Sequence, residues 1–303
     1  MAASRRRGSN CRTGESMPEL PEVETVRRGL GPAMEGRKIE RVQQNRKNLR
    51  FDFPDKFVSR LEGQTIERLD RRAKYLLIRL SGGETLLSHL GMSGRFTIES
   101  TGTGDTITDL AHASPANPKH DHVVFYLNGG VVVRYNDPRR FGYMDVFKTE
   151  EEQNVSFLSD LGPEPNSNHF SGRALKEALA GKKTAIKMAL LDQKIVAGLG
   201  NIYVCEALHR SGISPKCEAR NLSVPRIERL AVAVRDVINE AIEAGGSSLK
   251  DFASTDGALG YFQHQFRVYG REGGACPSEG CKGNIKRFVQ SGRSTFYCSS
   301  CQR

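Results

Sequence analysis

The stretch Met17-Pro18-Glu19-Leu20-Pro21-Glu22-Val23-Glu24-Thr25-Val26 opens the first regular element of this chain. If Met17 is the initiator and is removed, Pro18 carries a free secondary amine. An α-amino group titrates at about pH 8, so part of it is unprotonated and nucleophilic at neutral pH. Condensed with a sugar aldehyde carbon, this amine gives an iminium, an electron sink suited to breaking a glycosidic bond and then the neighbouring phosphate ester. The same residues also describe an ordinary helix start, because proline and carboxylates are both favoured in a first turn.

Residues 1–16 differ in kind from the rest. They hold four arginines against one acid, Glu15, and no apolar stretch, so they do not form a secretory signal. One interpretation is a disordered basic arm that touches phosphates; the other, which we favour, is a start codon assigned too early. An intact extension would place the Pro18 nitrogen in a peptide bond and abolish its nucleophilicity, so an active amine requires that the arm be absent or removed.

The charge and cysteine content narrow the class of protein. Among 303 residues, 45 Lys and Arg against 35 Asp and Glu leave a formal net charge of +10, which favours a polyanionic partner. No apolar run approaches the roughly 18 residues that span a bilayer, so we expect no membrane partner. Four of the seven cysteines lie between Cys276 and Cys301, which favours a metal site in a reducing compartment over a disulfide framework.

The hydrophobic pattern predicts an α+β multidomain fold. Helical spacing from Val23 to Leu30 is followed, from Ile39 to about Phe147, by short β-type runs separated by turns such as Asn128-Gly129-Gly130. We therefore predict an N-terminal helix on an antiparallel β-sandwich over residues 17–150. Residues 99–117 read as a polar surface insertion.

The second half of the chain is predicted to be helical. Leu161-Gly162-Pro163-Glu164-Pro165-Asn166 marks a linker, which we place at residues 151–165. A helical domain over residues 166–262 and a zinc ribbon over 263–303 follow. The expected helices are Arg173–Ala180, Thr184–Leu191, Ile202–Arg210 and about Pro225–Ala244, the last with one apolar stripe.

The pattern Cys276-x4-Cys281-x16-Cys298-x2-Cys301 is the most specific signal in the chain. Two pairs of thiolates on either side of a short β-hairpin suit one tetrahedral Zn²⁺. Four cysteines leave no open position for water, so the ion is expected to be structural. Four cations of the hairpin are expected to lie at its tip: Lys282, Lys286, Arg287 and Arg293.

Three further stretches carry residues that suit nucleic-acid binding. Arg71-Arg72-Ala73-Lys74 leads into a buried strand. His89-Leu90-Gly91-Met92-Ser93-Gly94 and Asp137-Pro138-Arg139-Arg140-Phe141-Gly142 read as loops whose Met, Arg and Phe could fill the gap left by an extruded base. The alternative is that Met92 and Phe141 are ordinary core residues.

Ala197-Gly198-Leu199-Gly200-Asn201 is a Gly-rich turn that opens a helix, a place where free backbone N–H groups favour an anion. The stretch Ser247-Ser248-Leu249-Lys250 leads into a loop of small residues, 253–260. That loop is either a cover for an extruded base or a plain connection to the ribbon.

Taken in order from Pro18 onward, these motifs resemble the formamidopyrimidine-DNA glycosylase family. The one departure is the first cysteine pair, which the family usually separates by two residues and this chain by four. The resemblance implies an N-terminal catalytic sandwich, a helix–two-turns–helix domain and a zinc finger. It also implies that Glu206 holds the Gly-rich turn, that loop 253–260 covers an extruded purine, and that His89 is structural.

The resemblance assigns the site residues as follows. Catalysis falls to Pro18, Glu19 and Lys74, with Glu19 and Glu22 as general acid or base. DNA binding falls to Met92, His120, Arg139, Arg140, Phe141, Asn201, Lys250 and Arg293, and zinc binding to Cys276, Cys281, Cys298 and Cys301.

The expected function is a bifunctional DNA glycosylase and AP lyase that removes oxidised purines from duplex DNA, acting as a monomer in the bacterial cytoplasm and associated with the nucleoid through DNA. An endonuclease VIII-like enzyme for oxidised pyrimidines is the nearest alternative, and Leu20 and Lys74 argue against it. A non-catalytic damage-binding protein is the other alternative, supported by residues 1–16.

Overall fold

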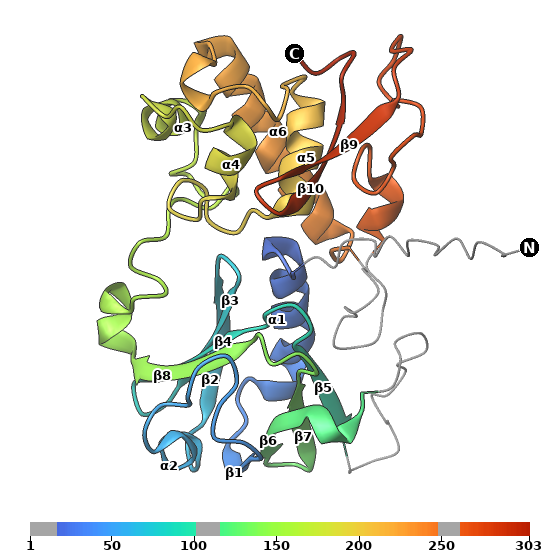
Figure 1. The fold of residues 1–303 in the computed structure, drawn as a ribbon. Helices are drawn as coiled ribbons and strands as arrows, with labels where there is room; N and C mark the ends of the chain where they lie inside the picture. The colour runs from blue at the N-terminus through green and yellow to red at the C-terminus, as the bar shows by residue number, and fades with distance from the viewer. Residues whose placement is uncertain (1–16, 101–115, 248–260) are drawn as a thin grey trace, which may run out of the picture.

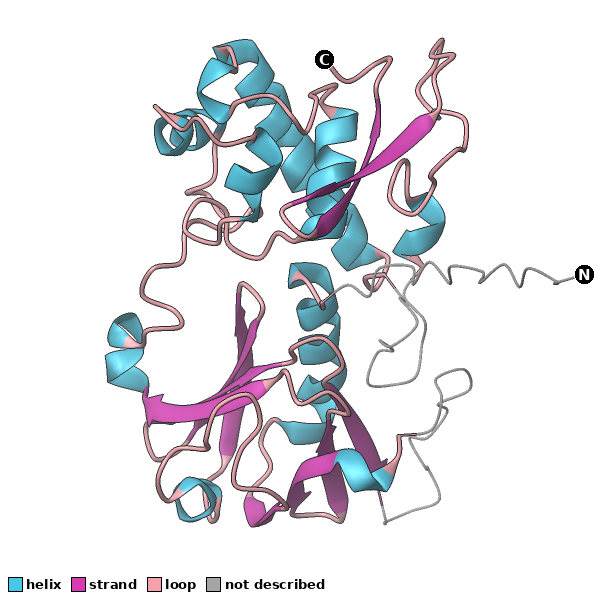
Figure 2. Ribbon diagram, viewed as in Figure 1, coloured by secondary structure: helices cyan, strands magenta, loops and turns pink. Residues whose placement is uncertain are grey.

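The computed structural model describes residues 17–100, 116–247 and 261–303. It has two halves, one built on sheets and one on helices, joined by a connection along one side (Figure 1). After α1, the strands precede the main group of helices along the chain, as the sequence predicts, and the α+β multidomain architecture is confirmed (Figure 2).

The N-terminal half is a sandwich of two four-stranded antiparallel sheets with helix α1 (Leu20–Met34) beside them. One sheet has the strand order β1-β6-β7-β5 and the other β2-β3-β4-β8. Apolar side chains from α1 and from both sheets share one buried core, because alternate residues of each strand face it. The strands are β1 (Ile39–Gln44), β2 (Ile66–Arg72), β3 (Tyr75–Leu80), β4 (Glu84–His89), β5 (Arg95–Ser100), β6 (Asp121–Leu127), β7 (Val131–Asn136) and β8 (Tyr143–Lys148), with the short helices α2 (Phe57–Leu61) and η1 (Pro118–His120) between them.

The turns follow the local sequence. Gly129 and Gly130 both have positive φ between the paired residues Leu127 and Val131, which makes the predicted hairpin of β6 and β7. The β2–β3 turn differs, because it uses Ala73 at φ +52° with Lys74 in place of glycine.

The helical half contains α3 (Gly172–Leu179), α4 (Ile186–Leu191), α5 (Asn201–Arg210) and α6 (Val224–Glu243). The stripe predicted for α6 is buried at every expected position: Ile227, Leu230, Ala231, Val234, Ile238 and Ala241. Helix α4 begins two residues later than predicted, because Thr184 and Ala185 form backbone contacts with the segment at Glu218 and Ala219.

The ribbon consists of β9 (Ile285–Gln290) and β10 (Arg293–Cys298), and β10 packs on α5. Its register corrects one expectation. Arg293 stands at the two-residue turn, but Lys286 pairs with Tyr297 beside Cys298, at the opposite end of the hairpin. Lys282 precedes β9, and Arg287 pairs with Phe296 inside the hairpin. Of the four predicted cations, only Arg293 therefore lies at the tip.

The two halves meet at the first turn of α1. Leu20 is fully buried in the hydrophobic core of the helical half, and its N–H donates to the carbonyl of Gly198 at 3.1 Å. On the other side of the junction, the buried Glu164 accepts from Arg71 at 2.9 Å and from the Ala73 N–H at 2.6 Å. The segment predicted as a linker is thus fixed at its end to the β2–β3 turn.

Candidate active site and nucleic-acid interface

Pro18 and Glu19 lie buried where α1 enters the helical half. One carboxylate oxygen of Glu19, Oε1, accepts the Ile202 N–H at 2.9 Å, while Oε2 is buried without a hydrogen-bond partner among the described residues. Burial raises the pKa of Glu19 to about 7, and the charge of Lys74 only partly opposes this. Glu19 therefore exchanges a proton near neutral pH, as a general acid requires.

The Gly-rich turn permits this close approach. A Cβ on Gly200 would collide with the carboxyl group of Glu19, and one on Gly198, at φ +92°, would collide with Leu20. Gln193 fixes the turn, since its Oε1 accepts the Gly198 N–H and its Nε2 donates to the Leu199 carbonyl, both at 2.9 Å. The glycines are needed here because α1 packs directly against their backbone.

Lys74 is brought to the same place from the β2–β3 turn, one residue before the strand that the sequence predicted it to begin. Burial lowers the pKa of its ammonium, the carboxylates of Glu19 and Glu22 oppose that change, and Arg293 adds to it. The charges of Glu19, Glu22 and Arg293 therefore all act on the Lys74 ammonium. Glu19 and Lys74 are buried here, whereas Arg293 is exposed.

Glu22 joins the segments around Glu19. Its Oε2 accepts the Glu19 N–H at 2.9 Å, and its Oε1 accepts Tyr203 Oη at 2.5 Å and both the N–H and the hydroxyl of Ser247 at 2.8 Å. The carboxylate is occupied by these four donors. Its observed role is to fix Glu19 against α5 and the end of α6.

The two predicted loops lie side by side and are held by one carboxylate. Asp137 is fully buried, and it accepts the hydroxyl of Ser93 at 2.5 Å and the N–H of Gly142 at 2.9 Å. The Met92 loop and the loop from Arg139 to Phe141 are therefore joined at their bases. Sequence reasoning did not single out Asp137, because its position between the two loops depends on how the strands pair.

The side chains at the loop tips are accessible. Phe141 is 42% exposed, so the interpretation of it as a core residue is wrong, and Met92 is half-buried. The Arg139 guanidinium lies over the Phe141 ring at 4.9 Å, and Arg140 is exposed with φ +57°. These loops present apolar and cationic surface together.

The predicted histidines occupy different positions. His89 is buried, accepts the Gly91 N–H through Nδ1 at 3.0 Å and stacks on Tyr143, which confirms a structural role. His120 is half-buried at the end of η1, and its carbonyl accepts the Asp137 N–H at 3.0 Å, which places it beside the Arg139 loop. Lys250 and loop 253–260 lie outside the described residues.

Asn201 binds the ribbon, and Glu206 binds the segment that leads to it. Asn201 Nδ2 donates to the Ser294 carbonyl at 2.9 Å, next to Arg293. Glu206 was expected to hold the Gly-rich turn, and this is corrected: its carboxylate accepts the N–H groups of residues 267–269 instead. Side chains on α5 thus fix both the segment at residues 267–269 and the ribbon strand that carries Ser294.

Lys187 is a residue that sequence reasoning missed. It is fully buried on α4 and donates to Thr295 Oγ1 at 2.7 Å and to the Ser294 carbonyl at 3.2 Å. Its helical spacing from the buried Leu190 is the signal that could have marked it as inward-facing. Together with Asn201, it sets the position of Arg293.

The four cysteines Cys276, Cys281, Cys298 and Cys301 converge, with all their sulfur atoms within 4.8 Å of one another. Two of the separations, Cys276–Cys301 and Cys281–Cys298, are 3.7 Å. A tetrahedron with metal–sulfur bonds of about 2.3 Å has sulfur–sulfur edges of about 3.8 Å, so the residues fit a tetrahedral thiolate site.

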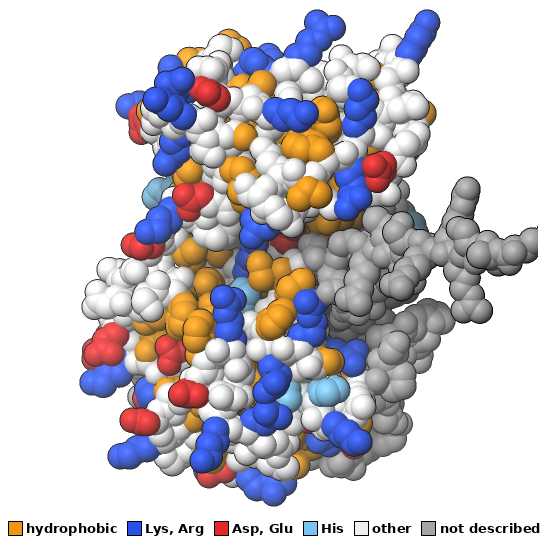
Figure 3. Space-filling view, in the orientation of Figure 1, with side chains coloured by type: hydrophobic (Ala, Val, Ile, Leu, Met, Phe, Trp, Pro, Cys, Tyr) orange, Lys and Arg blue, Asp and Glu red, His pale blue; other side chains and the backbone are white. Residues whose placement is uncertain are grey.

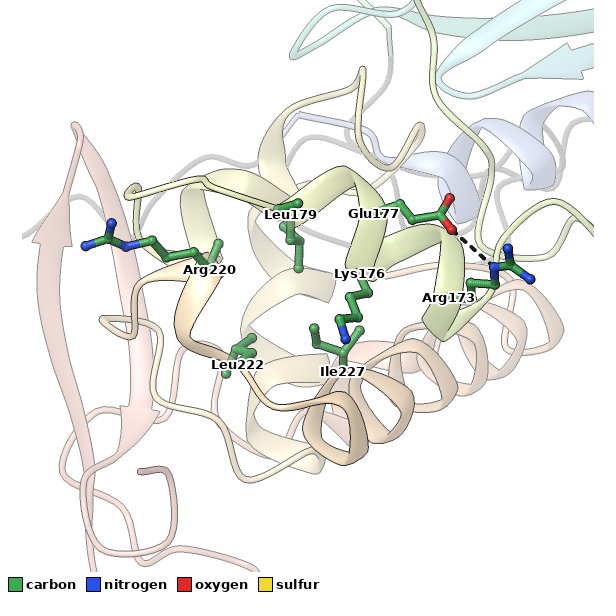
Figure 4. Close-up of a pocket in the computed structure, with 9 residues that line it drawn as sticks. Arg173, Lys176, Glu177, Leu179, Arg220, Leu222 and Ile227 are labelled. Carbon is green, nitrogen blue, oxygen red and sulfur yellow. Dashed lines mark hydrogen bonds and ion pairs between the residues drawn. The ribbon is translucent and has the colours of Figure 1, made fainter.

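The distribution of charged side chains on the surface suits an elongated anionic partner. Lys and Arg side chains line the hollow between the two halves, and apolar side chains border its lower rim (Figure 3). A separate open pocket between α3, η3 (Ala219–Asn221) and α6 contains none of the site residues and holds an exposed Arg173–Glu177 pair (Figure 4). Within the described part of the chain, no helix combines the length and apolarity needed to cross a membrane.

Comparison with known proteins decides the family. Residues 17–144 match the formamidopyrimidine-DNA glycosylase N-terminal domain, and residues 161–253 match the H2TH domain of the same enzymes. Formamidopyrimidine-DNA glycosylase of Ruegeria pomeroyi is 58% identical over 95% of this chain and 100% of its own. That of Caulobacter sp. strain K31 is 56% identical over 94% of this chain and 100% of its own. The chain belongs to the formamidopyrimidine-DNA glycosylase family. It is an enzyme of DNA repair, a DNA glycosylase that binds DNA.

Solved structures agree with this glycosylase fold. The MutM (Fpg) protein of Thermus thermophilus superimposes with a TM-score of 0.81 at 38% identity, covering 94% of this chain and 98% of its own. The Lactococcus lactis Fpg in complex with DNA containing an abasic site has a TM-score of 0.81 at 32% identity, covering 94% of this chain and 99% of its own.

Proposed function

We propose that this glycosylase is bifunctional: it removes an oxidised purine and then cleaves the strand as an AP lyase, with the Pro18 nitrogen as nucleophile. The observation that carries the proposal is the buried Glu19, whose pKa of about 7 and contact with α5 place a proton donor next to Pro18. The match to the family's N-terminal domain begins at residue 17, which supports Pro18 as the first residue of the active form.

In this mechanism Pro18 attacks C1′ of the deoxyribose while Glu19 protonates the ring oxygen, the sugar opens and the base leaves. The iminium on Pro18 then accepts the electron pair of the C2′–H bond as that proton is lost, and the resulting enamine expels the 3′ phosphate. Loss of the C4′ proton in the same way expels the 5′ phosphate, which completes β,δ-elimination. Lys74 and Arg293 stabilise the phosphates at this site. We assign proton transfer to Glu19 and not to Glu22, because the Glu22 carboxylate is already fully engaged.

The proposed substrates are formamidopyrimidines and 8-oxoguanine opposite cytosine in duplex DNA. The names of the relatives support the first, and a Lactococcus lactis Fpg variant has been solved with DNA containing Fapy-dG. Met92, Arg139 and Phe141 would fill the duplex where the base leaves, while Arg140, Asn201, His120 and Lys250 contact the backbone. Leu20, which begins α1 and packs against the Gly-rich turn, and Lys74 are the residues that favour the purine enzyme over the endonuclease VIII-like alternative.

We propose Zn²⁺ as the ion held by the four cysteines. The all-thiolate donor set and the fit of its sulfur separations support zinc. The ion would supply rigidity to the ribbon and take no part in bond breaking. The expected monomeric state stays a prediction, and a location with the chromosome of a bacterium follows from the proposed substrate and the bacterial relatives.

Borohydride trapping tests the nucleophile. Mass spectrometry first identifies protein that begins at Pro18, and borohydride is then added with 8-oxoguanine duplex. A covalent adduct is expected, and Pro18→Gly should lose trapping and nicking but keep most lesion binding. Protein that retains residues 1–16 and still cleaves at full rate would refute this role of Pro18 and favour another nucleophile.

Replacement of Cys298 and Cys301 by Ala tests the ribbon. The variant should contain no zinc and bind duplex DNA more weakly, because Arg293 loses its fixed position. Unchanged activity on duplex DNA without zinc would show that Arg293 has no such role.

A further inference from the structure

A histidine of α5 lies against the four-cysteine site. His209 is 3% exposed, and its Nε2 lies 3.4 Å from Cys276 Sγ and 3.3 Å from Ser278 Oγ. Ser278 belongs to the first cysteine pair, where four residues separate Cys276 from Cys281, and its hydroxyl lies 4.0 Å from Cys301 Sγ. The longer spacer therefore supplies a hydroxyl between the histidine and two of the thiolates.

The hydrogen-bonding groups around His209 fix the tautomer. A metal-bound thiolate sulfur can only accept, so the ring nitrogen beside Cys276 must carry the proton. The other nitrogen, Nδ1, is buried and has no hydrogen-bond partner in the described parts of the chain. A doubly protonated ring would leave an N–H unsatisfied there, so the arrangement fits a neutral histidine that donates from Nε2.

We propose that His209 donates a hydrogen bond from Nε2 to the Cys276 thiolate and, with Ser278, fastens the metal centre to α5. The inference rests on the proposed metal at the four cysteines. Four thiolates around a divalent cation carry a net charge of −2, and two of them, Cys276 and Cys298, are buried. A donor aimed at such a sulfur offsets part of that charge, and partners of this kind typically tune affinity for the metal.

The hydrogen bond completes a set of three attachments between α5 and the C-terminal segment from residue 267 onward, which contains the ribbon. Asn201 at the start of the helix holds the Ser294 carbonyl, Glu206 holds the N–H groups of residues 267–269, and His209 in the last turn holds Cys276. These attachments run from Asn201 to His209, about 12 Å along the helix. With all three made, the ribbon cannot slide along α5, and the metal centre becomes part of the helical domain.

The hydrogen bond can be observed directly in the full-length protein after substitution with ¹¹³Cd. A through-bond ¹H–¹¹³Cd correlation to the Nε2 proton of a histidine ring is expected, in addition to signals from backbone N–H groups. Bound cadmium without a histidine signal would overturn the hydrogen bond alone. Protein that binds neither zinc nor cadmium would overturn the proposed metal as well.

Substitution measures what the hydrogen bond contributes. His209→Phe keeps a planar aromatic ring and removes the donor, so zinc affinity measured by chelator competition should fall roughly 10- to 100-fold. His209→Gln, which can donate from a similar position, should recover much of that loss, and His169→Phe at an exposed histidine should have no effect. Equal zinc affinity in wild type and His209→Phe would overturn the proposal. If His209→Phe does not fold, zinc affinity is measured in His209→Gln and Ser278→Ala instead, and each should show a smaller loss of affinity than expected for His209→Phe.

Discussion

The junction at Glu19 and the paired loops at Met92 and Phe141 use buried carboxylates in opposite ways. At the junction the Glu19 carboxylate is the proposed proton donor, and its Oε2 has no partner among the described residues. At the loops, Asp137 has its hydrogen bonds made and only supports accessible side chains. The difference teaches that burial alone does not define the role of a carboxylate here: Glu19 keeps one oxygen without a partner among the described residues and has a raised pKa, whereas both oxygens of Asp137 hold the loops together.

Glu19→Gln should have the largest effect. It removes the proton donor but keeps the shape and the acceptor for Ile202, so base excision should fall roughly 10²- to 10⁴-fold. Single-turnover kinetics on 8-oxoguanine duplex measure this, with binding to the same duplex as the control. A loss below tenfold would mean that another group donates the proton.

The same variant should change how stability depends on pH. The folded-state pKa of Glu19, about 7, lies above its ordinary value of 4.5, so folding favours the protonated form. Its contribution to stability is fully present below about pH 4.5 and is lost as the pH rises to about 7. Relative to wild type, Glu19→Gln should therefore gain stability across this window, by roughly 3 kcal/mol at most. Urea unfolding at pH 5 and pH 8 measures the difference; a constant difference would contradict the raised pKa.

Gly200→Ala should act through the same carboxylate. The added Cβ collides with the Glu19 carboxyl group, and a displacement of about 1 Å at such a site can cost 10²-fold in rate. Gly31→Ala in α1 is the matched control, because its Cβ would meet only ordinary contacts at 3.8 Å. Both variants are compared by excision rate and melting temperature, and equal rates would refute the tight packing of Glu19 on the turn.

Asp137→Asn should have a smaller effect that depends on Phe141. An amide can accept at only one of the two oxygen positions, so the loops lose their common support. Excision should fall roughly tenfold, about 1.4 kcal/mol. In a double-mutant cycle with Phe141→Ala the losses should not add, since both changes remove the same wedge. Val232→Ala, an exposed apolar residue on α6, is the additive control.

Most of the secondary structure could be predicted from patterns of residues close together in the sequence. The alternation in the strands and the stripe on α6 predicted the elements, because burial of one face imposes a period of two or 3.6 residues. The cysteine spacing predicted the metal ligands because each pair of cysteines is close in sequence. Glu206 was assigned to the wrong segment, and Lys187 and Asp137 were missed, because each has a partner 44 or more residues away in sequence.

The sequence by itself determined the order of the elements, the four thiolates and the identity of the residues at the N-terminal motif. Only the tertiary structure decided what those residues can do. Glu19 has a raised pKa because α5, 183 positions away in sequence, closes over it and removes water. Lys74 is buried opposite it for the same reason. Desolvation depends on every neighbour at once, and no local spacing encodes it.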